Sequence, residues 1–141
     1  MITKLSVNSI MVLDKDQALD FYVNKLGLEK GQDIKQGSYR WLTVRVPGQP
    51  DVEISLEQPG PPVHDEGTAE QVRELVTKGA LGGLVFETDD IRGLYETLKS
   101  RGVTDFTQEP MDRFYGADMG IRDPFGNAIR ILQPKKVKAT A

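Results

Sequence analysis

Three segments of the chain carry apolar residues at the spacing of one helix face. They run over residues 14–27, 68–79 and 89–102, and within each the apolar side chains recur three or four positions apart. Each segment opens on a residue whose side chain can accept hydrogen bonds from the first helical turn, and each ends at a glycine. In the second, Thr68 and Gln71 form a capping-box pattern. The pattern predicts three amphipathic helices.

Eight other segments alternate apolar and polar residues, as strands with one buried face do. We expect strands over residues 5–13, 28–34, 39–46, 52–57, 81–87, 104–108, 117–122 and 128–133. Residues 123–127 read Asp-Pro-Phe-Gly-Asn and predict a tight connection, because proline fixes one backbone dihedral angle and Gly-Asn tolerates positive φ. The order is strand, helix and three strands, twice over, which predicts the α+β class.

A short internal repeat indicates that this five-element module is duplicated. Asp14 and Gly27 recur 75 residues later as Asp89 and Gly102, a spacing that matches one module plus its linker. We expect a single domain over residues 1–134, made of a first module over about 4–58, a linker and short helix over 59–80, and a second module over about 81–134. Residues 135–141 form a basic tail.

Composition and charge exclude several classes of function. The 141 residues contain no cysteine and one histidine, His64, and the formal net charge is −3. A disulfide framework, a thiolate metal site and a cysteine nucleophile are therefore excluded. His64 lies in a Pro/Gly-rich segment, which predicts a solvated loop residue. Because binding to nucleic acid needs a basic face, we expect no nucleic acid partner. No apolar run reaches the roughly 18 residues that span a bilayer, so we expect a cytoplasmic protein with no membrane partner.

Two motifs give the chain a resemblance to a known family. They read Val12-x-Asp14-x-Asp16-x-Ala18-x-x-Phe21-Tyr22-x-x-x-Leu26-Gly27 and Asp123-Pro124-Phe125-Gly126-Asn127. With them the chain resembles the vicinal oxygen chelate superfamily, also called the glyoxalase/bleomycin resistance/dioxygenase family, over residues 4–134. The resemblance implies two βαβββ modules that form a curled mixed sheet around a cavity. It does not determine the activity, because the family includes both metal enzymes and antibiotic-sequestering proteins.

The family's enzymes hold a divalent metal on up to four positions, one on the first strand and one on the last strand of each module. Counted from the motifs, the resemblance places these positions at Val7, Ser55, Gly83 and Arg130. None of the four offers a carboxylate or an imidazole, and the charge of Arg130 would repel a cation. The resemblance therefore implies a family member without the metal site, and we expect no cofactor.

Strand alternation predicts which side chains face the cavity, because the neighbours of inward-packing apolar residues point to the opposite face. The candidate ligand-binding residues on that face are Val7, Ser9, Met11, Trp41, Thr43, Arg45, Glu53, Ser55, Val85, Glu87 and Arg130. This mixture suits a small organic ligand, planar or partly aromatic.

Two of these residues also have purely structural interpretations. Trp41, the sole tryptophan, could be a core residue, since tryptophan is highly buried on average. Arg130 could form an ion pair with a neighbouring carboxylate such as Glu53 or Glu87, which would neutralise its charge without any ligand.

These observations leave several functions open. The first is a metal-free binding module that sequesters a toxic small molecule such as an antibiotic. The second is a metal-independent enzyme of lyase or isomerase type, in which Glu53, Glu57 or Glu87 moves a proton. A third is a regulatory or immunity subunit, and a metal-dependent enzyme follows if the strand register is misread. We also expect a homodimer, because related proteins complete their clefts by pairing modules between subunits.

Overall fold

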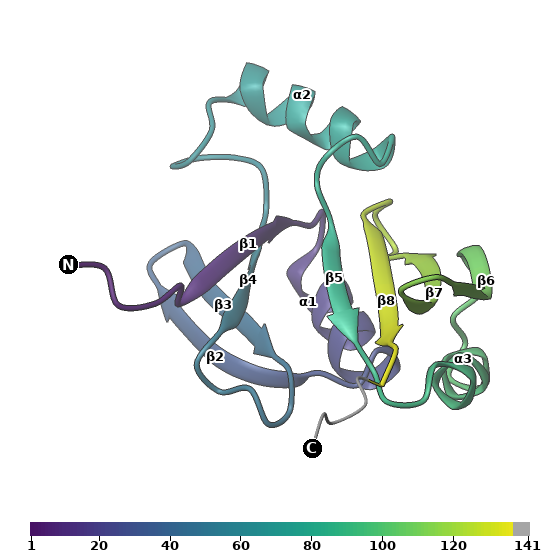
Figure 1. Ribbon diagram of the computed structural model, residues 1–141. Coiled ribbons are helices and arrows are strands. Elements are labelled where there is room, and N and C mark those ends of the chain that lie inside the picture. Colours follow the sequence, from purple (N-terminus) through teal and green to yellow (C-terminus); the bar gives the residue numbers. More distant parts are fainter. Residues whose placement is uncertain (137–141) are drawn as a thin grey trace. The chain divides into compact units, whose positions relative to one another are not determined.

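The computed structural model describes residues 1–136, and its elements follow the predicted order (Figure 1). The strands are β1 (Val7–Met11), β2 (Glu29–Gln36), β3 (Tyr39–Arg45), β4 (Glu53–Glu57), β5 (Leu84–Glu87), β6 (Phe106–Arg113), β7 (Gly116–Arg122) and β8 (Ala128–Pro134). The helices are α1 (Lys15–Leu19), which continues as the π-helix η1 (Asp20–Lys25), then α2 (Glu66–Thr77) and α3 (Ile91–Ser100). None of the helices within residues 1–136 is long and apolar enough to cross a membrane. Most of the predicted basic tail, from position 137 onward, lies outside the described residues.

Each module folds as a unit with its own four-stranded mixed sheet. The first unit comprises residues 1–82 and 124–127, and its sheet has the strand order β1-β4-β3-β2. The second comprises residues 83–123 together with the chain from 128, and its sheet has the order β5-β8-β7-β6. In both sheets the first strand runs parallel to the last strand of the module, and the other pairs are antiparallel. The α+β class and the two βαβββ modules are confirmed.

In the first unit, α1 and η1 cover one face of the sheet and bury its apolar side chains. The buried strand residues are Ile10, Leu42, Val44, Ile54 and Leu56. The rings of Phe21 and Tyr22 in η1 are also buried, edge to face, with 5.1 Å between their centroids. The main-chain N–H of Leu26 donates to the carbonyl of Phe21 (2.8 Å), the longer-range bond of a π-turn. One helix was predicted here, and its second half takes this wider form.

In the second unit, α3 packs beside β6 (Figure 1) and against β7 and β8. Its buried residues Ile91 and Leu98 form a core with four buried strand residues, which are Met119, Ile121, Ile129 and Ile131. The helix begins where predicted, because the Asp90 carboxylate accepts the N–H of Gly93 at 3.0 Å.

The structure differs from the sequence prediction at the start of α2 and the end of β6. The capping box at Thr68 does not form, because α2 already begins at Glu66 and Asp65 is the cap, its carboxylate accepting the N–H of Thr68 at 2.7 Å. Strand β6 runs to Arg113 and not only to residue 108. It passes through Pro110 at an irregularity in the pairing with β7. Proline is tolerated there because β6 is an edge strand and needs no donor on its free side.

The turn between β7 and β8, residues 124–127, is part of the first unit. The amide of Asn127 donates to the main-chain carbonyl of Met11 at 2.7 Å. Gly126 has a φ of +112°, and a side chain there would meet the carbonyl of Val76 at 2.7 Å. The second motif therefore has a structural role in fastening a late segment of the chain to β1.

Candidate functional site

The face of the first sheet opposite its helix carries most of the predicted ligand-binding residues. Ser9 lies opposite Ser55 across β1 and β4, and Ser55 lies opposite Thr43 across β4 and β3. The hydroxyl oxygens of Ser9 and Ser55 are 2.7 Å apart. The remaining members, Val7, Met11, Trp41, Arg45 and Glu53, follow the same two-residue period along these strands. The alternation read from the sequence therefore brings them to one face.

Thr43 and Ser55 are buried, although they were expected to line an open cleft. The hydroxyl of Thr43 accepts the main-chain N–H of Gln32 at 2.8 Å, and the side-chain amide of Gln32 donates to Glu53 at 2.7 Å. A side chain at Gly31 would lie 2.5 Å from both the Thr43 hydroxyl and the Glu53 carboxylate. The backbone of β2 therefore covers this part of the face. A ligand would reach Trp41 and Ser9 before it reached the buried hydroxyls of Thr43 and Ser55.

Trp41 is partly exposed, so a ligand can reach its side chain from solvent. Its partner in the strand pairing is Ile34 of β2, whose side chain is 54% exposed. Arg45, at the other end of β3, donates to Glu29 (3.2 Å) in an exposed ion pair. The neighbouring side chains of Trp41 and Ile34 form the part of this face best suited to the flat surface of an organic molecule.

In the second unit, Val85 and Arg130 lie opposite each other on β5 and β8, and Glu87 follows on β5. Val85 is 69% exposed. Arg130 forms an ion pair with a carboxylate, as one of its two interpretations expected, but within the second unit this carboxylate is not the one named there, Glu87. Its partner is Asp118 of β7, with 2.7 Å between Nη2 and Oδ2.

Asp118 is the centre of a hydrogen-bond network that the sequence analysis missed. Besides Arg130, it accepts the phenol O–H of Tyr115 at 2.5 Å and the side-chain amide of Gln108 at 2.7 Å. Arg113 approaches its other oxygen at 3.7 Å. The signal in the sequence was a carboxylate between two apolar residues of a strand, because a buried acid needs partners.

The network changes the acidity of its members. The pKa of Asp118 is lowered to about 2, first by the hydrogen bond from Tyr115 and then by those from Arg130 and Gln108. The pKa of Tyr115 is raised, because its O–H donates to this carboxylate. At neutral pH the site therefore contains an ionised Asp118 and a protonated Tyr115.

The four positions that the resemblance equates with metal ligands carry no carboxylate or imidazole. Val7 has no donor atom, and the Ser55 hydroxyl is engaged with Ser9. A Cβ on Gly83 would lie 1.7 Å from the carbonyl oxygen of Ala128, so no side-chain ligand can replace this glycine without a backbone shift. Arg130 brings a positive charge. Across residues 1–136 we find no group of three or more His, Asp or Glu residues placed to hold a metal ion.

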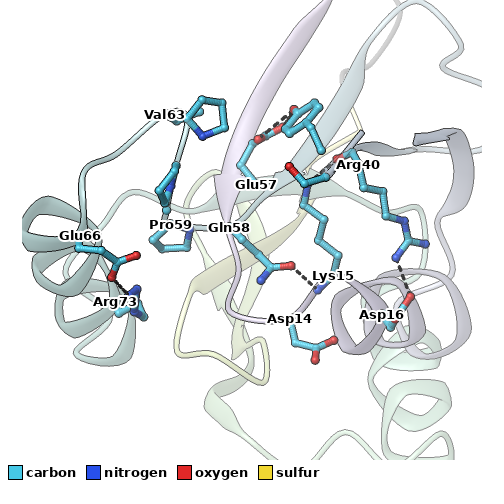
Figure 2. Close-up of a pocket in the computed structure, with 15 residues that line it drawn as sticks. Asp14, Lys15, Asp16, Arg40, Glu57, Gln58, Pro59, Val63, Glu66 and Arg73 are labelled. Carbon is cyan, nitrogen blue, oxygen red and sulfur yellow. Dashed lines mark hydrogen bonds and ion pairs between the residues drawn. The ribbon is translucent and has the colours of Figure 1, made fainter. Parts of the chain in front are cut away.

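A pocket of about 410 Å³ lies in the first unit and was not predicted (Figure 2). Its walls come from the start of α1, the start of β3, the end of β4, the proline-rich loop that follows β4, and α2. Lys15 is nine-tenths buried on this wall, donates to the main-chain carbonyl of Arg40, and lies 4.8 Å from the centroid of the Tyr39 ring. Tyr39 in turn donates to both oxygens of Glu57, at 2.9 and 3.2 Å.

Burial sets the acidity of two of these groups. It lowers the pKa of Lys15, against the attraction of Glu57. It also raises the pKa of Tyr39, and the hydrogen bond to Glu57 raises it further.

The signal for this pocket in the sequence was the run of prolines after β4. This run forms a stiff wall, because each proline has a fixed φ.

His64 follows this proline-rich loop and is half-buried, although a solvated side chain was predicted. Its main-chain N–H donates to the carbonyl of Gly60 at 2.8 Å. Its Nδ1 atom is buried and has no hydrogen-bond partner among the described residues.

Comparisons with known proteins agree with this architecture. The family model of the Glyoxalase/Bleomycin resistance protein/Dioxygenase superfamily matches residues 4–131. Uncharacterized protein YurT of Bacillus subtilis (strain 168) is 35% identical over 130 residues, which cover 92% of this chain and 98% of YurT. Among solved structures, UcmS2 has a TM-score of 0.88 at 42% identity and covers 94% of this chain and 98% of its own. TnmS3, an antibiotic binding protein from Streptomyces sp. CB03234, has a TM-score of 0.75 at 29% identity, with 95% and 98% covered.

Proposed function

This chain belongs to the Glyoxalase/Bleomycin resistance protein/Dioxygenase superfamily, and on that premise we propose that it is a binding protein. It takes up a small organic molecule, such as an antibiotic, on the open faces of its sheets and releases it chemically unchanged. Neither a metal nor another cofactor takes part.

The observation that carries this proposal is the pair of Trp41 and Ile34 on the open face of the first sheet. The two side chains are neighbours in the strand pairing, and both have access to solvent. Exposed apolar groups rimmed by polar ones are typical of a binding surface. Ser9, Arg45 and Glu53 supply such a rim on the same face.

The relatives support the same function. TnmS3, which is described as an antibiotic binding protein, shares the fold over nearly the whole of both chains. The four positions that the resemblance equates with metal ligands are Val7, Ser55, Gly83 and Arg130. They offer no carboxylate or imidazole, which favours a binding function over metal-dependent chemistry.

The sole tryptophan provides the test. We would titrate the protein with planar natural products, aromatic acids and 2-oxo compounds, and follow Trp41 fluorescence. At least one compound should quench it saturably and be recovered intact by mass spectrometry. Ile34→Ala should weaken that compound about fivefold, through the loss of roughly 1 kcal/mol of apolar contact. Leu75→Ala is the control, because Leu75 is a similarly exposed apolar residue on α2. Equal effects of the two substitutions, or no saturable quenching at all, would contradict the proposal.

The pocket in the first unit favours a second candidate, a metal-independent enzyme. Glu57 accepts a hydrogen bond from Tyr39 beside the buried Lys15, and all three line a cavity of about 410 Å³. Such groups can move a proton on a bound substrate. Conversion of the ligand, abolished by Glu57→Gln without loss of affinity, would establish this function instead.

A further inference from the structure

Two arginine side chains converge on the Asp118 network in the second unit. Arg130 of β8 and Arg113 at the end of β6 both donate to the amide oxygen of Gln108, at 3.4 and 3.3 Å. Both also approach Asp118, at 2.7 and 3.7 Å. Within this hydrogen-bond network one carboxylate therefore faces two guanidinium groups, so the network itself carries a net positive charge.

The two arginine side chains are held in place, but they remain exposed and keep donor atoms for further hydrogen bonds. Their side chains are 39% and 41% exposed, whereas that of Asp118 is only 10% exposed. Within residues 1–136, Arg130 makes its hydrogen bonds through Nη2 alone, which leaves Nε and Nη1 free to donate. Gly120 makes this arrangement possible, because a Cβ there would lie 2.8 Å from Nη1 of Arg130 and 2.3 Å from the hydroxyl of Thr107.

An aromatic surface adjoins the two guanidinium groups. Phe114 and Tyr115 directly follow Arg113, and their rings meet edge to face with 5.1 Å between centroids. Phe114 is 88% exposed. Val85, opposite Arg130 in the strand pairing, adds a further exposed apolar group. The hydrogen-bond donors of the two arginines thus lie beside an exposed apolar surface.

We infer that Arg113 and Arg130 form a receptor for the acidic group of an aromatic organic acid. The inference rests on the proposed binding function and narrows its ligand class. Preorganised guanidinium donors form short, charge-assisted hydrogen bonds with carboxylates. Asp118 and Gln108 act as positioning residues, since they hold both arginines without contacting the ligand. Glu87, an exposed carboxylate on the strand next to Arg130, opposes the binding of an anion.

The test compares 2-naphthoate with 2-naphthamide, which has the same shape and no charge. Affinities come from calorimetry, and the contact comes from the NMR shifts of the arginine Nε–H groups. We expect the acid to bind at least about tenfold more tightly than the amide. R113Q and R130Q should each reduce this preference to about threefold or less. E87Q should raise the affinity for the acid about twofold without affecting the affinity for the amide.

K99Q is the matched control, because Lys99 is a cation of similar exposure that pairs with Glu96 on α3 in the same unit. It should leave the preference intact. If R130Q fails to fold, R130K can be used instead. It retains the positive charge but lacks the planar guanidinium group with its several donors, so it should lose part of the preference for the acid. R113Q removes a half-exposed side chain and is the less disruptive variant.

Equal affinity for the two probes, no binding of either at millimolar concentration, or a preference that survives R113Q would overturn the inference. These outcomes leave the proposed function standing if another compound still quenches Trp41 saturably. Conversely, acid-specific shifts at Arg113 and Arg130 would support the receptor even if no compound affected Trp41.

Discussion

Arg130 of β8 and Asp118 of β7 form an ion pair across adjacent strands, with 2.7 Å between Nη2 and Oδ2. Arg130 is the position that the resemblance to the family equates with an acidic metal ligand, and in this chain its positive charge lies against Asp118. The hydrogen bond from Tyr115, followed by those from Arg130 and Gln108, lowers the pKa of Asp118 to about 2.

Asp118→Asn should lower the free energy of unfolding at pH 7 by about 1–3 kcal/mol, because a charged hydrogen-bond acceptor of the network is lost. The folded-state pKa of Asp118, about 2, lies below the ordinary value of 3.8. Its ionised form therefore stabilises the fold above about pH 4, and this contribution disappears as the pH falls toward 2. Urea denaturation should show that the wild type loses more stability than Asp118→Asn over this range.

Asp112→Asn provides the control for that measurement, because Asp112 forms an exposed ion pair with Arg92 at 3.4 Å. This substitution should change stability by less than about 1 kcal/mol. Parallel pH profiles for the wild type and Asp118→Asn would contradict the role assigned to Asp118.

Gly83→Ala should destabilise the protein by about 2–3 kcal/mol, because the new methyl group would overlap the carbonyl of Ala128. The adjacent Gly82→Ala is a stringent control, since a Cβ at Gly82 meets nothing within 4 Å. Thermal unfolding of the two variants should separate them clearly. Equal stability would show that β5 can move away from β8, which would reopen position 83 to a ligand side chain.

We expect protein purified without chelators to contain no stoichiometric divalent metal. The four positions that the resemblance equates with metal ligands, which are Val7, Ser55, Gly83 and Arg130, offer no carboxylate or imidazole, and Arg130 repels cations. Elemental analysis after dialysis tests this. Zinc, nickel, manganese or iron at one equivalent per chain, lost on substitution of Ser9 or Glu53, would refute it.

We propose that the protein is a homodimer in solution. Each sheet ends in edge strands, β1 and β2 in the first unit and β5 and β6 in the second, and exposed edges are commonly covered by association. Light scattering at micromolar concentration should give twice the chain mass of 15.7 kDa. A mass of one chain at that concentration would contradict the proposal.

Local patterns were sufficient to predict the order of the elements and the faces of the strands. Asp14 and Asp90 cap α1 and α3, and both are recognisable from a few neighbouring residues. The alternation in β1, β3 and β4 likewise assigned Ser9, Trp41 and Ser55 to one face, because the period of two is a property of any extended strand.

Contacts between distant segments were not predictable in this way. The sequence alone determined that Arg130 would lie on the cavity face of its strand, but only the tertiary structure selected Asp118 over Glu87 as its partner in the second unit. In the same way, the pocket of Lys15, Tyr39 and Glu57 requires the start of α1 to meet the start of β3 and the end of β4. The physical reason is that capping and strand alternation depend on near neighbours, whereas burial, ion pairing and shifted pKa values depend on which side chains strand pairing brings together.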